Sequence, residues 1–185
     1  MTQDHEVVWT LNASDGELLV RTEVAGRAAK MGHRLTIAMK RWQATVQWLD
    51  GEPVRAALTV DVDSLEVLHG EGGIKALSGP EKVLVRSNAL KSLGAARFPQ
   101  ISFDADTIGK RHDGYRLAGT LRIRGKSRAQ VIGLDTADLG DSWRMSSHAT
   151  VRQSDFAVKP YSLLMGSLKV ADEVAVSFSA QRTKG

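Results

Sequence analysis

Apolar and polar side chains alternate along most of the chain, and the alternation is clearest between residues 97 and 125. Its first limb carries apolar residues at every second position, namely Ile101, Phe103 and Ala105. Its second limb does the same with Tyr115, Leu117, Gly119, Leu121 and Ile123. The polar run Lys110-Arg111-His112-Asp113-Gly114 separates the limbs and has the composition of an Asp-Gly-type turn. A period of two on both sides of such a turn predicts a hairpin of half-buried strands.

The same period recurs before and after this hairpin. The further candidate strands are residues 7–11, 17–24, 34–40, 42–48, 56–63, 129–134, 142–152 and 172–182. Strong turn signals such as Asp50-Gly51-Glu52-Pro53 separate some of them. Short strands at regular spacing are typical of antiparallel barrels and sandwiches. We therefore expect an all-β fold, a barrel of about eight antiparallel strands.

The middle of the chain changes character. Residues 70–80 are rich in glycine and predict a flexible loop, whereas residues 80–93 contain helix-forming residues and no glycine or internal proline. Ser78 or Gly79 suits the N-terminal cap of a helix, and Gly94 suits the C-terminal cap. We predict one helix here, packed outside the barrel or across one end. With no repeat and no low-complexity linker, the chain is expected to form a single domain, residues 1–185.

The composition of the chain excludes several kinds of functional site. The chain has 185 residues and no cysteine, which excludes disulfides, thiolate metal sites and cysteine nucleophiles. No His-x-x-x-His spacing and no Gly-x-Ser-x-Gly elbow occurs. We expect no catalytic residue, no metal and no cofactor. The first six residues include Asp4 and Glu6 and form no apolar run, and no stretch approaches the ~20 residues of a membrane-spanning helix. We therefore expect a cytoplasmic protein without a transmembrane segment.

Several motifs, in order, resemble the YceI family of lipocalin-like proteins. They are Trp9, Gly32-His33, Phe98-Pro99-Gln100-Ile101-Ser102-Phe103, Gly119-Thr120-Leu121-Arg122-Ile123-Arg124-Gly125, Arg152-Gln153-Ser154-Asp155-Phe156 and Asp172-Glu173-Val174. The resemblance covers nearly the whole chain. It implies an extended eight-stranded barrel that holds a long apolar chain of isoprenoid or fatty-acyl type. The chain differs from the family's pattern at residues 25–31, an Ala-rich segment that could form a short helical turn, and at residues 70–79.

The predicted inward faces combine large and small side chains. Small residues beside large ones leave room in an eight-stranded barrel for one ligand, or they pack the taper of a filled interior. If the barrel is open, the candidate lining is Leu18, Val20, Leu35, Ile37, Trp48, Val60, Phe103, Leu117, Gly119, Leu121, Trp143, Met145, Phe156, Val176 and Phe178. Burial contributes roughly 0.8 kcal/mol per methylene, so an apolar chain could bind without specific polar contacts.

A basic cluster follows the second limb of the hairpin, where Arg122 and Arg124 are predicted to point outward and Lys126 and Arg128 come directly after. Arg122, Arg124, Arg128 and Arg152 are the candidates to meet an anionic lipid head group. The alternative is a charged solvent face that protects strand edges. Nucleic acid is disfavoured as a partner, because the nearby aromatic residues point inward and no stacking platform is apparent.

Three functions agree with these observations. The first is non-catalytic binding or carriage of a long apolar small molecule, and we favour it. The second is an enzyme acting on a lipid-like substrate, for which His33 and Asp155 would be the candidates. The third is an interaction module whose barrel interior is packed. A homodimer is compatible with the sequence.

Overall fold

The computed structural model describes residues 5–185, so the first four residues of the N-terminal stretch lie outside the described part. The described residues form one α-helix, four short 3-10 turns and twelve strands. The strands are β1 (Glu6–Asn12), β2 (Gly16–Ala25), β3 (His33–Met39), β4 (Trp42–Leu49), β5 (Glu52–Asp61), β6 (Leu65–Gly72), β7 (Gln100–Arg111), β8 (Gly114–Ile123), β9 (Lys126–Asp138), β10 (Ser142–Arg152), β11 (Ser162–Leu163) and β12 (Leu168–Thr183). The helix is α1 (Gly79–Leu93), and the turns are η1 (Ala29–Met31), η2 (Val62–Ser64), η3 (Gln153–Phe156) and η4 (Leu164–Gly166).

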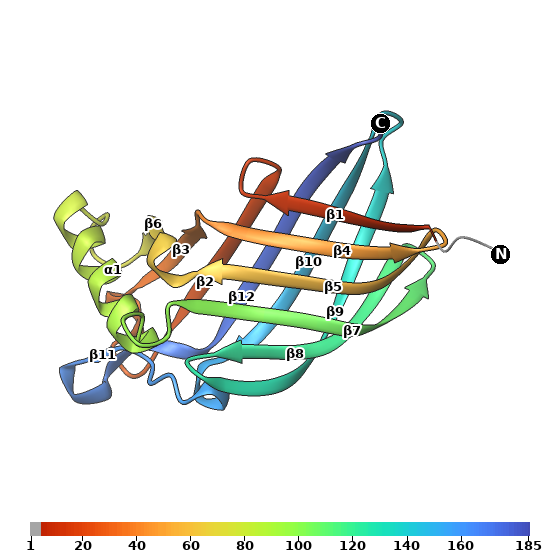
Figure 1. Ribbon diagram of the computed structural model, residues 1–185. Helices are drawn as coiled ribbons and strands as arrows, with labels where there is room; N and C mark the ends of the chain where they lie inside the picture. Colours follow the sequence, from red (N-terminus) through yellow and green to blue (C-terminus); the bar gives the residue numbers. More distant parts are fainter. Residues whose placement is uncertain (1–4) are drawn as a thin grey trace.

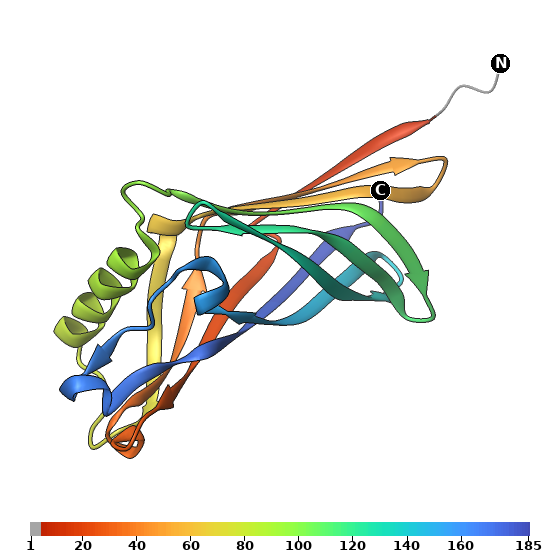
Figure 2. The same ribbon diagram turned by 90° about the horizontal axis from the view of Figure 1, so that it is seen from below.

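All the strands belong to one curled antiparallel sheet (Figure 1). Eleven of them pair in the order β1-β4-β5-β7-β8-β9-β10-β12-β2-β3-β6, and β11 adds a short pair to β12. Figure 2 shows the sheet bending round on itself, so that β1, β4 and β5 lie on one wall and β12 and β2 on the other. The result is a half-barrel. Among the described strands, β1 and β6 are the two ends of the pairing order.

The predicted all-β, lipocalin-like fold with one helix is confirmed. The two predicted limbs of the central hairpin pair as β7 and β8, with Phe103 opposite Leu121, and a β-bulge after Ala105 shifts the register before Arg111 pairs with Gly114. The count differs, with twelve strands rather than about eight. The glycine-rich segment after residue 69 does not begin as a loop, because Gly70 and Gly72 still pair with β3 at the end of β6.

The helix lies across one end of the half-barrel (Figures 1 and 2). It begins with a capping box in which the Ser78 hydroxyl accepts from the backbone N–H of Glu81 and the Glu81 carboxylate accepts from that of Ser78. It ends at Gly94, whose φ of 63° is left-handed. Arg86 attaches it to the sheet by donating to the carbonyl oxygens of Leu65 and Asp63. Within residues 5–185, no helix has both the length and the apolar character needed to cross a membrane.

The interior is packed at the end away from α1. Where this packed region borders the strand positions of Val60 and Leu18, Trp42 and Phe178 meet edge to face across the interior with ring centroids 5.3 Å apart. Farther from α1, the ring centroids of Trp9 and Trp48 lie 4.6 Å apart. The Arg182 guanidinium lies 4.7 Å from the centre of the Trp9 ring. These side chains join the two walls and fill the space between them.

Candidate functional site

The end of the half-barrel beneath α1 holds an apolar cavity of about 550 Å³. Side chains of ten strands line it, and α1 covers it. This volume is within the ~300–1,000 Å³ typical of small-molecule sites. The interior is therefore packed at one end and hollow at the other, which combines the two alternatives that the sequence left open.

Nine of the predicted lining residues face this cavity. They are Leu18, Val20, Leu35, Ile37, Val60, Phe103, Leu121, Phe156 and Val176. They come from distant parts of the chain, and only the alternation on each strand identifies them beforehand. Sequence reasoning did not include the helix. Two neighbouring rows of α1 residues line the cavity. One row is Val85, Ala89 and Leu93, and the other is Leu84, Asn88 and Ser92.

Five other predicted residues point inward but belong to the packed regions. Trp48 contacts Trp9, Phe178 contacts Trp42, and Lys184 lies over the ring of Trp143. Met145 and Leu117 are buried in the core clusters. Alternation assigns a side chain to a face, but it does not say how far along the interior the hollow extends.

Gly119 does not line the cavity, and its small size has a different cause. It pairs with Ala105 directly beside a β-bulge in β7. A Cβ atom at this position would lie 2.0 Å from the Asp104 carbonyl oxygen and 2.6 Å from the Ala105 Cα. The glycine therefore permits close approach of the two backbones, and a larger side chain would meet β7 rather than enter the hollow.

Several polar side chains of the lining form hydrogen bonds within the protein itself. The buried Thr22 hydroxyl accepts from the backbone N–H of Leu35 at 3.1 Å, and Gln153 donates to the Ala171 carbonyl oxygen. His33 Nε2 lies 2.6 Å from the carbonyl oxygen of Lys75. Their engagement leaves a wall suited to hydrocarbon.

The two segments that differ from the family pattern meet at the cavity mouth. Met31 and Leu77 come from them and line the cavity beside Gly32, His33 and Glu81. The Ser78 backbone N–H, which donates to the Glu81 carboxylate, holds the pKa of Glu81 below its usual value, and the hydroxyl cap, Lys75 and His33 act in the same direction. Asp155, the other candidate of the enzyme hypothesis, is exposed and does not line the cavity.

Three of the four predicted head-group arginines are exposed and lie away from the cavity. Arg122 and Arg128 donate to the hydroxyl and carbonyl oxygens of Ser127, and Arg152 forms an exposed ion pair with Glu173 at 3.2 Å. None of the three lines the cavity or the hollow beside it. Arg122 points outward as predicted and Arg152 does the same, whereas Arg128 lies on the same face as its pairing partner Leu121, at the exposed end of the hairpin.

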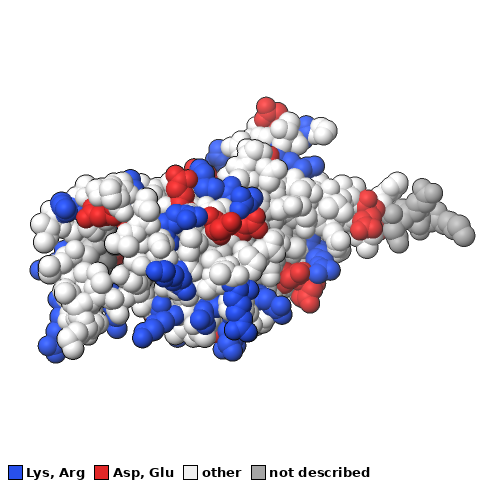
Figure 3. All heavy atoms as spheres, turned by 60° about the vertical axis from the view of Figure 1, so that its left-hand side comes forward, with Lys and Arg blue, Asp and Glu red and all other residues white. Residues whose placement is uncertain are grey.

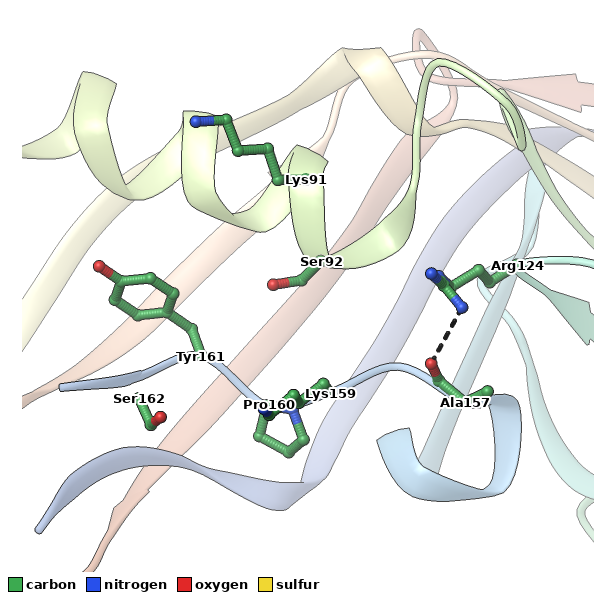
Figure 4. A pocket seen from close by; sticks show the side chains of 8 residues that line it. All are labelled: Lys91, Ser92, Arg124, Ala157, Lys159, Pro160, Tyr161 and Ser162. Carbon is green, nitrogen blue, oxygen red and sulfur yellow. Dashed lines mark hydrogen bonds between the residues drawn. The ribbon is translucent and has the colours of Figure 1, made fainter. Parts of the chain in front are cut away.

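Arg124 differs from its neighbours because the tight turn between β8 and β9 redirects it. Its φ of 50° is left-handed, and its side chain turns toward η3, where Nη1 donates to the Ala157 carbonyl oxygen at 3.2 Å (Figure 4). It there lines a hollow of about 390 Å³ between the end of α1 and residues 157–162. Ser92 and Tyr161 line this hollow and the apolar cavity alike, so the two adjoin.

Comparison with known proteins identifies the family. The YceI-like domain model matches residues 9–182. The chain belongs to the YceI-like family. Among similar solved structures, BcnA of Burkholderia cenocepacia is 19% identical, with a TM-score of 0.70 over 92% of this chain and 98% of that one. The YCEI protein of Campylobacter jejuni is 16% identical, with a TM-score of 0.58 over 80% of this chain and 84% of that one. No curated protein sequence matches significantly.

Proposed function

We propose that this YceI-like protein binds one long apolar chain, of isoprenoid or fatty-acyl type, in the cavity beneath α1 and carries it without changing it chemically. The observation that carries the proposal is the apolar cavity of about 550 Å³. Membership of the family supports it, because YceI-like proteins are associated with apolar ligands of this kind.

The lining explains why such a ligand would be favoured. A chain that enters exchanges water for aliphatic and aromatic walls, and gains roughly 0.8 kcal/mol for each methylene buried. Because the polar groups Thr22, His33 and Gln153 already have partners, they would not need to be desolvated on binding. Affinity would then depend on chain length more than on any one contact.

The cover of the cavity suits entry and release. No residue of α1 is fully buried, and Leu84 is 61% exposed although it lines the mouth. A helix held by so little buried surface can open at lower cost than the sheet. Carriage, as opposed to permanent retention, requires such an element.

The test is displacement of a fluorescent fatty acid by geranylgeraniol and by palmitate, followed by recovery of both competitors and their analysis by mass spectrometry. We expect saturable one-to-one displacement and unaltered competitors. Absence of saturable binding would refute the proposed ligand class. Conversion that disappears in His33→Ala would instead favour the enzyme hypothesis.

A further inference from the structure

The hollow at Arg124 has a chemistry opposite to that of the cavity it adjoins. Its eight lining residues are Lys91, Ser92, Arg124, Ala157, Lys159, Pro160, Tyr161 and Ser162. Three of them are cationic, three carry hydroxyl groups and none is acidic. Figure 3 shows the same bias on a larger scale, with Lys and Arg side chains prevailing along the lower edge of the face at the helix end.

The cations of this hollow are not neutralised by carboxylates. Most ion pairs in residues 5–185 engage other arginines, such as Arg41 with Asp61 and Arg55 with Asp104. Lys91, Arg124 and Lys159 take part in none within that part of the chain. A guanidinium has five N–H groups, and that of Arg124 gives one bond, to the Ala157 carbonyl oxygen. Its buried Nε has no partner in the described residues.

One feature of the fold acts against an anion here. The hollow lies at the C-terminal end of α1, where the helix dipole amounts to roughly half a negative charge. Three full positive charges exceed this several-fold. Figure 4 shows Ser92 pointing into the hollow and Lys91 extending along the helix, from where its flexible four-carbon stem can turn toward a ligand.

We propose that Lys91, Arg124 and Lys159 bind the phosphate or diphosphate group of an amphiphile whose hydrocarbon chain lies in the adjoining cavity. The inference rests on the proposed function, since it places the ligand's other end. Arg124 supplies the directed N–H groups, and the lysines supply charge at the rim. The ligand would pass between Ser92 and Tyr161, the two residues that line both spaces. Only Arg124 of the four arginines predicted from the sequence takes part.

The experiment compares three probes at low salt: geranylgeranyl diphosphate, geranylgeraniol and inorganic diphosphate. The test variant is K91E/K159E, and the matched control is R122E/R128E, which changes the net charge equally at two exposed arginines, two and four residues from Arg124, that line neither the hollow nor the cavity. A further variant, K91Q/K159Q, removes the charges without adding negative ones. Unfolding curves of all variants accompany the affinities.

For the wild type and for R122E/R128E we expect the diphosphate to bind at least about tenfold more tightly than the alcohol, a difference of about 1.4 kcal/mol. In K91E/K159E the preference should fall below about threefold, with alcohol binding unchanged, and in K91Q/K159Q it should be reduced. Raising the salt concentration should weaken the preference.

Equal affinity for the diphosphate and the alcohol in the wild type would overturn the inference, as would equal loss in the control. Inorganic diphosphate that binds as tightly as the prenyl compound would also overturn it, because the hollow would then take a free phosphate compound. Failure of the alcohol itself to bind would count against the proposed function, so the two failures are distinguishable.

Discussion

Ala149 offers the sharpest test of whether the hollow holds a hydrocarbon chain. It lies on β10, pairs with Val176 of β12, and contributes a half-buried methyl group to the cavity wall. Ala149→Leu adds three carbon atoms that point into the hollow. His148→Leu is the matched control, because residue 148 is exposed and successive side chains of a strand point to opposite faces.

The expected loss of affinity follows from the length of ligand chain that the larger side chain displaces. Three added carbons exclude about three methylenes of a chain that fills the cavity, which costs about 2.4 kcal/mol at roughly 0.8 kcal/mol per methylene. At 1.4 kcal/mol per tenfold this is a loss of about 50-fold in affinity. A chain too short to fill the cavity can shift aside, so its affinity should change much less.

The assay measures dissociation constants of decanol and hexadecanol by displacement of a fluorescent fatty acid. We expect Ala149→Leu to weaken hexadecanol strongly and decanol little, with no loss of unfolding free energy, and His148→Leu to leave both alcohols unchanged. If the interior were packed around Ala149, overpacking would lower the unfolding free energy by about 1–3 kcal/mol. That result together with unchanged binding would refute the reasoning.

Two further predictions concern the fold. Gly119→Ala should lower the unfolding free energy by about 1–3 kcal/mol, because its Cβ would meet the β7 backbone. Gly109→Ala is the control and should leave the unfolding free energy unchanged, because no atom lies near its Cβ position. Equal effects of the two substitutions in chemical denaturation would contradict this prediction. Glu81 has a depressed pKa, so its stabilising effect is present above its unfolded value of 4.5 and lost as pH falls through the lower folded value. Glu81→Ala should therefore destabilise the protein at pH 7 and much less at pH 2, and an undiminished difference at pH 2 would argue against the capping role.

The sequence predicted the sheet and the helix well because both depend on local patterns. The hairpin follows from the alternation on its two limbs and from the turn residues between them, although the bulge that shifts its register after Ala105 has no signal in the pattern. The helix follows from its caps at Ser78 and Gly94. Strand β6 was not predicted at all, and its glycine end, Gly70 to Gly72, stays in the sheet through pairing with β3 despite the low strand preference of glycine.

For each site residue, the sequence predicts the face of the strand on which its side chain lies, but not whether the side chain reaches the cavity. Val20 and Trp48 both point inward, yet one lines the hollow and the other packs against Trp9. Which of them meets empty space depends on how the two walls converge across the interior, and no local pattern encodes that distance. Arg124 is a similar case, since the left-handed turn that redirects its side chain separates it from Arg122 on the same strand.

The most direct measurement of the central claim is native mass spectrometry of the purified protein, as isolated and after incubation with geranylgeraniol. The account predicts one bound chain per protein molecule, retained by the wild type and by His148→Leu but largely lost from Ala149→Leu. A wild-type protein that stays free of any long-chain molecule under both conditions would contradict it.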